Sequence, residues 1–92
     1  MKDELQDLID LLHERKCSCV LRNGEIYTFE RRGVEDLYAL LREQPGLLLG
    51  ADVADKVVGK GAAALMVLGR VRRVYADVLS EPAYGLLFQA GI

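Results

Sequence analysis

Apolar residues recur at helical spacing in two segments of the N-terminal half of the chain. In the first segment they are Leu5, Leu8, Ile9 and Leu12, and in the second Val34, Leu37, Tyr38 and Leu41. A spacing of three and four residues gathers such side chains on one face of a helix. We therefore predict a helix over residues 2–15, begun by a capping box of Asp3 and Gln6, and a second helix that Pro45-Gly46 ends.

Two short β-prone runs, Cys17–Arg22 and Glu25–Glu30, lie between these helices and are joined by Asn23-Gly24. This dipeptide between extended segments is a strong hairpin signal, because both turn positions require positive φ. The pattern predicts an antiparallel hairpin.

The second half of the chain alternates apolar runs with helix signals. Residues 46–54 form a near-continuous apolar run, which is typical of a central strand covered on both faces. An alanine-rich helix is predicted over residues 55–68, with Gly69 as its stop, and a strand over residues 71–79. Ser80-Glu81-Pro82 then begins a last helix, which runs to residues 90–91.

The resulting order is αββαβαβα. It predicts one α/β domain over residues 1–92, a three-layer α-β-α architecture in which helices cover both faces of a mixed sheet. Gly91 followed by Ile92 reads as a helix that closes before another element, so we expect the chain to be truncated at its C-terminus.

Composition narrows the function classes. The formal net charge is −2, which gives no general electrostatic reason to expect a nucleic-acid partner. No apolar run approaches the roughly 20 residues that span a bilayer, and Met1-Lys2-Asp3-Glu4 does not begin a signal peptide. We therefore expect a cytoplasmic protein without a membrane partner. The hydrophobic fraction of 51% also permits a buried interface in a homo-oligomer.

Cys17 and Cys19 are the only cysteines. In an extended run both side chains would lie on the same face, roughly 6.6 Å apart, which is a poor geometry for a disulfide. One interpretation is two small buried hydrophobic residues; the others are half of a metal site or a redox pair. His13 lies beside the apolar stripe of the first helix, which favours a solvated or partly covered side chain. We expect neither a metal ion nor a cofactor.

The richest candidate chemistry lies where two strands end and two helices begin. Unpaired N–H groups and the helix dipole favour an anion at such a place. The predicted ligand-binding residues are Asp55, Lys56, Gly59, Lys60, Gly61, Ser80 and Glu81. The competing interpretation is structural: the small residues allow close packing, the lysines reach water, and Ser80 caps its helix.

Other polar groups give weaker signals. Arg31 and Arg32 precede the second helix as a solvated pair or a phosphate clamp, and residues 70–73 form a modest basic cluster with Lys60. No aromatic platform accompanies this cluster, so binding of single-stranded nucleic acid is not supported. No nucleophile–base constellation is visible, and the catalytic residues, if any exist, remain unknown.

The order of elements resembles the cytidine-deaminase-like fold. An uncharacterised prokaryotic family of unknown function with that fold is similar to the chain from Cys17 onward. The segments that carry this resemblance are Arg32-Gly33-Val34, residues 51–60, Leu79-Ser80-Glu81 and Ala90-Gly91-Ile92. The run Asp55–Lys60 is the specific part.

The resemblance implies a site without zinc. Deaminases bind zinc through a His or Cys two residues before a glutamate, and through a P-C-x-x-C motif on the next helix. When Pro82 is aligned with that proline, the two cysteine positions fall on Ala83 and Leu86, which cannot bind a metal. Residues 55–68 contain no His-x-Glu or Cys-x-Glu. Zinc-dependent deamination is therefore not expected.

The sequence thus leads to two functional hypotheses. The first is a non-zinc deaminase-fold domain that binds a small anionic or nucleotide-like metabolite. The second is a non-catalytic structural or regulatory module that acts through oligomerisation. An enzyme that uses Cys17 or Cys19 as its nucleophile is a third class, and it requires a reactive thiol.

Overall fold

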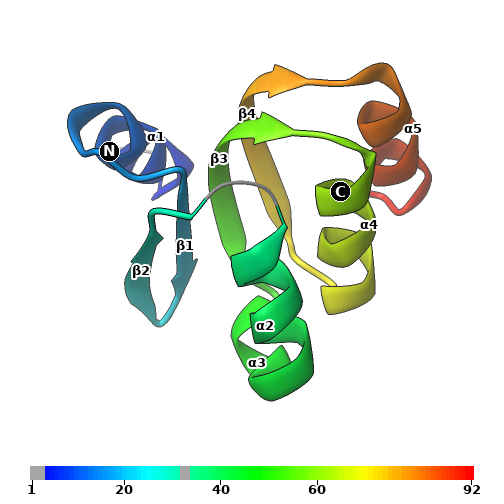
Figure 1. The fold of residues 1–92 in the computed structure, drawn as a ribbon, viewed down its shortest axis with the longest axis horizontal. Helices are drawn as coiled ribbons and strands as arrows, with labels where there is room; N and C mark the ends of the chain where they lie inside the picture. The colour runs from blue at the N-terminus through cyan, green and yellow to red at the C-terminus, as the bar shows by residue number, and fades with distance from the viewer. Residues whose placement is uncertain (1–3, 32–33) are drawn as a thin grey trace.

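A computed structural model describes residues 4–31 and 34–92 of the chain. Within them a four-stranded sheet has the order β2-β1-β3-β4 (Figure 1). The elements are α1 (Glu4–Glu14), β1 (Cys19–Asn23), β2 (Glu25–Phe29), α2 (Glu35–Glu43), α3 (Pro45–Leu48), β3 (Asp52–Val58), α4 (Lys60–Gly69), β4 (Arg73–Leu79) and α5 (Glu81–Gln89). Strand β1 is antiparallel to both neighbours, whereas β3 and β4 are parallel. The predicted mixed α/β sheet is confirmed, with α3 as an additional short helix.

Both faces of the sheet are covered, which yields two hydrophobic clusters. Helix α1 packs against β1 and β3 on one face, where Leu8, Leu12 and Val20 are buried together. The other face carries α2, α4 and α5, and its larger cluster includes Val53 and Met66. Figure 1 shows α1 apart from the remaining helices, with the strands between them.

The predicted boundary between the central strand and its helix is wrong. Strand β3 runs to Val58 and α4 begins at Lys60, so Asp55 and Lys56 lie in a strand rather than at a helix start. Residues 55, 57 and 58 pair in parallel with residues 76, 78 and 79 of β4. This pairing outweighs the helical spacing of the local sequence, because each ladder bond satisfies backbone groups that a buried segment must pair.

The apolar run assigned to the central strand is also divided differently. Pro45 begins α3, and residues 45–48 are helical rather than extended. Gly50 then adopts a φ of +74°, which turns the chain before β3 begins at Asp52. Continuous apolar character therefore covered two elements, since periodicity alone does not separate a buried strand from a buried helical turn.

The predicted hairpin is present, but its turn is tighter than expected. Asn23 pairs with Glu25 across a single intervening residue, Gly24, whose φ is +77°. Asn23 itself has no positive φ. Its side-chain nitrogen instead lies 3.0 Å from the carbonyl oxygens of residues 46, 47 and 49, which ties the hairpin to α3.

Helix ends match the sequence in part. Ser80 caps α5 as predicted, since its Oγ accepts a hydrogen bond from the Ala83 N–H at 3.2 Å. Gly69 is the last residue of α4, and the left-handed residue that follows is Arg70, with a φ of +60°. A Cβ on Gly69 would lie 2.7 Å from Leu48 Cδ1, so this glycine permits close packing. The capping box of Asp3 and the pair Arg32-Gly33 lie outside the described residues.

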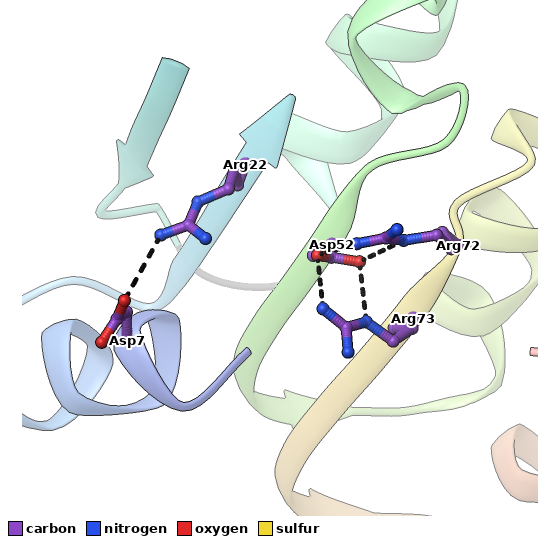
Figure 2. A network of polar contacts seen from close by, with 5 residues as sticks. All are labelled: Asp7, Arg22, Asp52, Arg72 and Arg73. Atoms are coloured by element: carbon purple, nitrogen blue, oxygen red, sulfur yellow. Dashed lines mark hydrogen bonds and ion pairs between the residues drawn. The ribbon is translucent and has the colours of Figure 1, made fainter. Parts of the chain in front are cut away.

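A buried carboxylate joins the beginnings of β3 and β4. Asp52 is 2% exposed, and both its oxygens accept hydrogen bonds from Arg72, at 3.0 and 2.7 Å, and from Arg73, at 3.1 and 2.9 Å (Figure 2). The hydrogen bonds from Arg73 and then Arg72 hold the pKa of Asp52 well below its usual range. Two arginines of the predicted basic cluster thus bind a carboxylate of the protein itself. Asp7 and Arg22 form a looser pair of 4.0 Å nearby.

We expect Asp52→Asn to lower the free energy of unfolding by about 2 kcal/mol at neutral pH, because it removes the charge that two guanidinium groups bind. The folded-state pKa is depressed, so this contribution is present above the unfolded pKa of about 4 and is lost as the pH falls through the folded pKa. Urea unfolding from pH 7 to pH 3 measures the difference in free energy of unfolding between the wild-type protein and Asp52→Asn. This difference should become smaller at low pH. Asp7→Asn is the control, with an expected loss within about 0.5 kcal/mol. An equal loss in both variants at neutral pH contradicts this assignment.

Candidate ligand cavity

A cavity of about 570 Å³ opens beside the C-terminal half of β3. Its walls come from the segment that enters β1, the end of β2, the start of α2 and β3 itself. The lining residues are Lys16, Cys17, Ser18, Cys19, Phe29, Glu30, Arg31, Asp36, Leu37, Asp55, Lys56 and Val57. The volume lies within the range of about 300–1,000 Å³ that is common for small-molecule sites.

A carboxyl and a thiol lie side by side in this cavity. Cys19 and Asp55 are directly opposite each other in the β1–β3 pair, so their side chains share the face that carries α2. The two residues are 6% and 7% exposed, respectively. Burial raises the pKa of Asp55 to about 6, against the hydrogen bonds from the backbone N–H groups of Val57 (3.3 Å) and Lys56 and from the Cys19 thiol.

The same environment suppresses ionisation of the thiol. Burial, followed by the negative charges of Asp55 and Asp36, raises the pKa of Cys19 far above its usual range. A thiolate is the reactive form of cysteine, so Cys19 is not poised as a nucleophile.

Three exposed cationic residues, Lys16, Arg31 and Lys56, line the cavity from three different segments. Lys56 follows Asp55 on β3, so its side chain points to the opposite face of the sheet, where its charge favours the ionised form of Asp77. Arg31 lies 3.6 Å from a carboxylate oxygen of Asp36 at the start of α2. The Ser18 hydroxyl lies 2.6 Å from the Arg31 carbonyl oxygen. This contact holds the irregular segment after β2 against the segment that enters β1.

Two of the seven predicted ligand-binding residues, Asp55 and Lys56, line this cavity. Gly59, Lys60 and Gly61 lie at the start of α4, and Ser80 and Glu81 at the start of α5; they are not among its lining residues. The two helix starts are adjacent, as predicted, because the Ser80 N–H donates to the Val58 carbonyl at 3.1 Å.

Of the two glycines at the start of α4, Gly61 has a packing neighbour, whereas a Cβ on Gly59 would meet no atom within 4 Å. A Cβ on Gly61 would lie 3.5 Å from Val34, a residue that leads into α2. Gly59 is the N-cap of α4 and makes no side-chain cap. The predicted pocket between the helix starts and the cavity beside β3 are therefore two separate locations that share β3.

The prediction that Cys17 and Cys19 lie on one strand face is wrong. Strand β1 begins at Cys19, so the strand alternation does not extend back to Cys17. Cys17 is buried in the α1 cluster, with its Sγ 4.0 Å from the Leu11 carbonyl oxygen, whereas Cys19 belongs to the larger cluster. Both are free thiols, and the described residues contain no group of three or more potential ligands that could hold a metal.

His13 is exposed, with 48% of its side chain accessible, which agrees with the predicted solvated or partly covered side chain. Its Nε2 lies 2.8 Å from Asp77 Oδ1, and the Tyr75 hydroxyl donates to the same oxygen at 2.5 Å. The hydrogen bonds from Tyr75 and then His13 lower the pKa of Asp77. This cluster connects α1 to β4 and lies outside the cavity.

Sequence reasoning missed Ser18, Phe29 and Asp36 as parts of a site, and it treated Cys19 only as half of a cysteine pair. These residues converge on Asp55 through strand register and through the position of α2. One local signal could have located this site. Asp55 directly follows the apolar run of residues 46–54, and a carboxyl at that position falls in a covered strand.

Together, these features define an α/β protein with a mixed sheet and a cavity of small-molecule size beside its central strand. The chain belongs to the TM1506 family, a domain of unknown function (DUF1893), whose model matches residues 7–92. The membership rests on nearly the whole chain. The sequence-based prediction that the chain belongs to an uncharacterised family is therefore confirmed.

A solved structure extends this comparison to the fold. The crystal structure of a DUF1893 family protein, TM1506 from Thermotoga maritima, superposes with a TM-score of 0.83 at 23% sequence identity. The match covers 99% of the present chain and 63% of the Thermotoga chain. No curated protein matches the sequence. Among the described residues, no helix has the length and apolar character needed to cross a membrane.

Both thiols should resist modification in the folded protein. We expect Cys19 in a Cys17→Ala variant to react with iodoacetamide at least about tenfold more slowly than in urea, because the thiol is buried and its pKa is raised. Mass spectrometry of quenched samples measures the rate, and Cys19→Ala reports Cys17 separately. Rapid native labelling of Cys19 would instead support the cysteine-nucleophile class.

Proposed function

We propose that this protein binds a small organic anion, such as a nucleotide-like metabolite, in the cavity beside β3. The observation that carries the proposal is the combination of cationic and apolar residues around a volume of about 570 Å³. Lys16 and Arg31 line the cavity from different segments and can neutralise a phosphate or carboxylate. The side chains of Phe29, Leu37 and Val57 offer apolar surface to the rest of the ligand.

The carboxyl of Asp55 supplies the polar contact deeper in the cavity. Ligand sites commonly combine apolar walls with a few polar groups, and groups with strongly shifted pKa values gather at such sites. Asp55 meets both criteria, since it is buried, lines the cavity and has a pKa raised to about 6.

The helix starts remain the alternative location for the ligand. Gly59, Lys60 and Gly61, with Ser80 and Glu81, were predicted from the sequence as parts of a pocket, and that assignment stays a prediction. Each location has a lysine that the other lacks: Lys16 lines the cavity, and Lys60 lies at the start of α4. This difference allows a matched comparison.

Further support comes from the proposed deaminase-like fold without its zinc chemistry. The mixed sheet with helices on both faces agrees with such a fold. The residues present do not fit zinc, because α5 carries Ala83 and Leu86 at the positions of the ligand cysteines, and α4 contains no His, Cys or Glu. We therefore propose binding without zinc-dependent deamination. The cytoplasmic location stays a prediction.

Isothermal titration calorimetry with AMP, CMP, GMP, UMP and inorganic phosphate tests the proposal. We expect at least one nucleotide to bind, and Lys16→Ala to weaken its affinity about tenfold, because one charge-assisted contact is lost. Lys60→Ala should leave that affinity unchanged. The reverse ranking would relocate the site to the helix starts, and no binding by any probe to the wild-type protein would overturn the proposal.

Self-association is a second candidate function, and a specific surface favours it. Tyr84 and Phe88 of α5 stack with ring centroids 5.9 Å apart, and they are 58% and 70% exposed. Leu68 of α4 is also exposed. Large apolar side chains at a surface are typical of an interface.

Sedimentation velocity at micromolar concentration tests this second candidate. A dimer that Phe88→Ser dissociates is the expected result if α5 forms the interface. A monomer at every concentration contradicts it, and Glu81→Ser is the control at an exposed position of the same helix.

A further inference from the structure

We infer that the cavity takes up its anion together with a proton, which the carboxyl of Asp55 carries. This inference rests on the proposed function, since it specifies how the charge of the ligand is accommodated. The site would thus select anions that can accept a hydrogen bond from a neutral carboxylic acid. It would also release them as the pH rises.

The position of Asp55 is the first argument. The residue lies in the central strand, paired with Cys19 on β1 and with Ala76 on β4. Its carboxyl accepts hydrogen bonds from the N–H groups of residues 56 and 57 and from the thiol, but none of these groups carries a full positive charge. Among the described residues, the buried charge of Asp55 therefore has no direct cationic partner of the kind that Asp52 has in Arg72 and Arg73.

The balance of charge around the cavity is the second argument. Among the described residues that line it, Arg31 lies 3.6 Å from Asp36, so these two charges compensate each other. The other lining carboxyl groups are Glu30 and Asp55. Protonation of Asp55 removes one negative charge beside a bound anion and so favours its binding.

The described elements around Asp55 contribute several other titratable or charged groups. The segment before β1 contributes Lys16 and Cys17, and β1 contributes Cys19, whose own pKa is raised. The end of β2 contributes Glu30 and Arg31, α2 contributes Asp36, and β3 contributes Lys56. The β4 residue opposite Asp55 is Ala76, which cannot titrate.

The proton changes what Asp55 does for a ligand. An ionised carboxylate only accepts hydrogen bonds and repels an oxyanion, whereas the protonated acid donates its O–H to one. Because burial already raises the pKa of Asp55 to about 6, solvent supplies the proton within the physiological range. A neighbouring anion raises this pKa further, and by linkage anion binding takes up a proton.

The test uses benzenesulfonate, a probe that stays a monoanion throughout the range from pH 5 to pH 8. Its affinity for the wild-type protein should fall by up to about tenfold per pH unit above the pKa of Asp55, which is about 6. Calorimetry in two buffers with different ionisation enthalpies should register proton uptake on binding at pH 7. Asp55→Asn keeps an oxygen that can accept the local hydrogen bonds but removes the titration. It should bind at pH 8 as it does at pH 6.

Two matched variants identify the titrating group. Asp36→Asn removes another carboxyl of the cavity, and His13→Gln removes the histidine, the type of side chain that otherwise titrates near neutrality. Both should keep the pH dependence of the wild-type protein. Loss of the pH dependence in either variant, with its retention in Asp55→Asn, overturns the inference.

The outcomes also separate this inference from the proposed function. If the wild-type protein binds benzenesulfonate with an affinity that does not depend on pH, the proton coupling is overturned but the proposal of anion binding stands. No binding of benzenesulfonate by the wild-type protein or Asp55→Asn at any pH overturns the inference, whereas anion binding is overturned only if the nucleotides and phosphate also fail to bind. If Asp55→Asn does not fold, carbon NMR of the Asp55 carboxyl in the wild-type protein decides: its pKa should rise with benzenesulfonate, and an unchanged value contradicts the inference.

Discussion

The rest of the structure depends on the burial of one central strand, β3. It pairs with β1 on one side and β4 on the other, and helices cover both of its faces. The four residues from Asp52 to Asp55 are all buried, and the first and last carry carboxyl groups. A buried charge must find compensation or change its protonation. The carboxyl groups of Asp52 and Asp55 point to opposite faces of the sheet. Asp52 binds two arginines there, whereas the hydrogen-bond donors around Asp55 are uncharged.

On the α1 face, compensation of Asp52 also fixes strand register. Asp52 is the direct partner of Arg73 in the parallel β3–β4 pair, and Arg72 donates its backbone N–H to the Ala51 carbonyl at 2.7 Å. Side-chain and backbone bonds therefore meet where the chain returns from α4 into β4. A shift of one residue would move both guanidinium groups away from the carboxylate, so the charge pair specifies the alignment as well as stabilising it.

Much of the architecture was readable from the sequence, because periodicity and turn residues act locally. The stripe of α1, the Asn23-Gly24 hairpin and the Ser80 cap each needed only a few neighbouring residues. The division of residues 46–58 was not readable, since pairing with β4 decided where the strand ended and α4 began.

The candidate site was only half predictable for the same reason. Asp55 and Lys56 stood out because they follow an apolar run. Their association with Cys19 and Asp36 depends on long-range register and on where α2 packs, and no local pattern encodes either. At 23% identity, the Thermotoga structure supports the arrangement of elements and leaves side-chain chemistry to be argued from this chain's own residues.

The contrast between the two carboxyls is the strongest argument for a ligand beside β3. A residue retained only for stability would gain from a cationic partner, as Asp52 does, or from replacement by an apolar side chain of similar volume. Asp55 has neither advantage: burial raises its pKa to about 6, so near neutral pH its charged form costs stability. A group of this kind that lines a cavity of small-molecule size favours a role in binding over one in folding. Lys16 and Arg31, which also line the cavity, then favour an anion as the ligand.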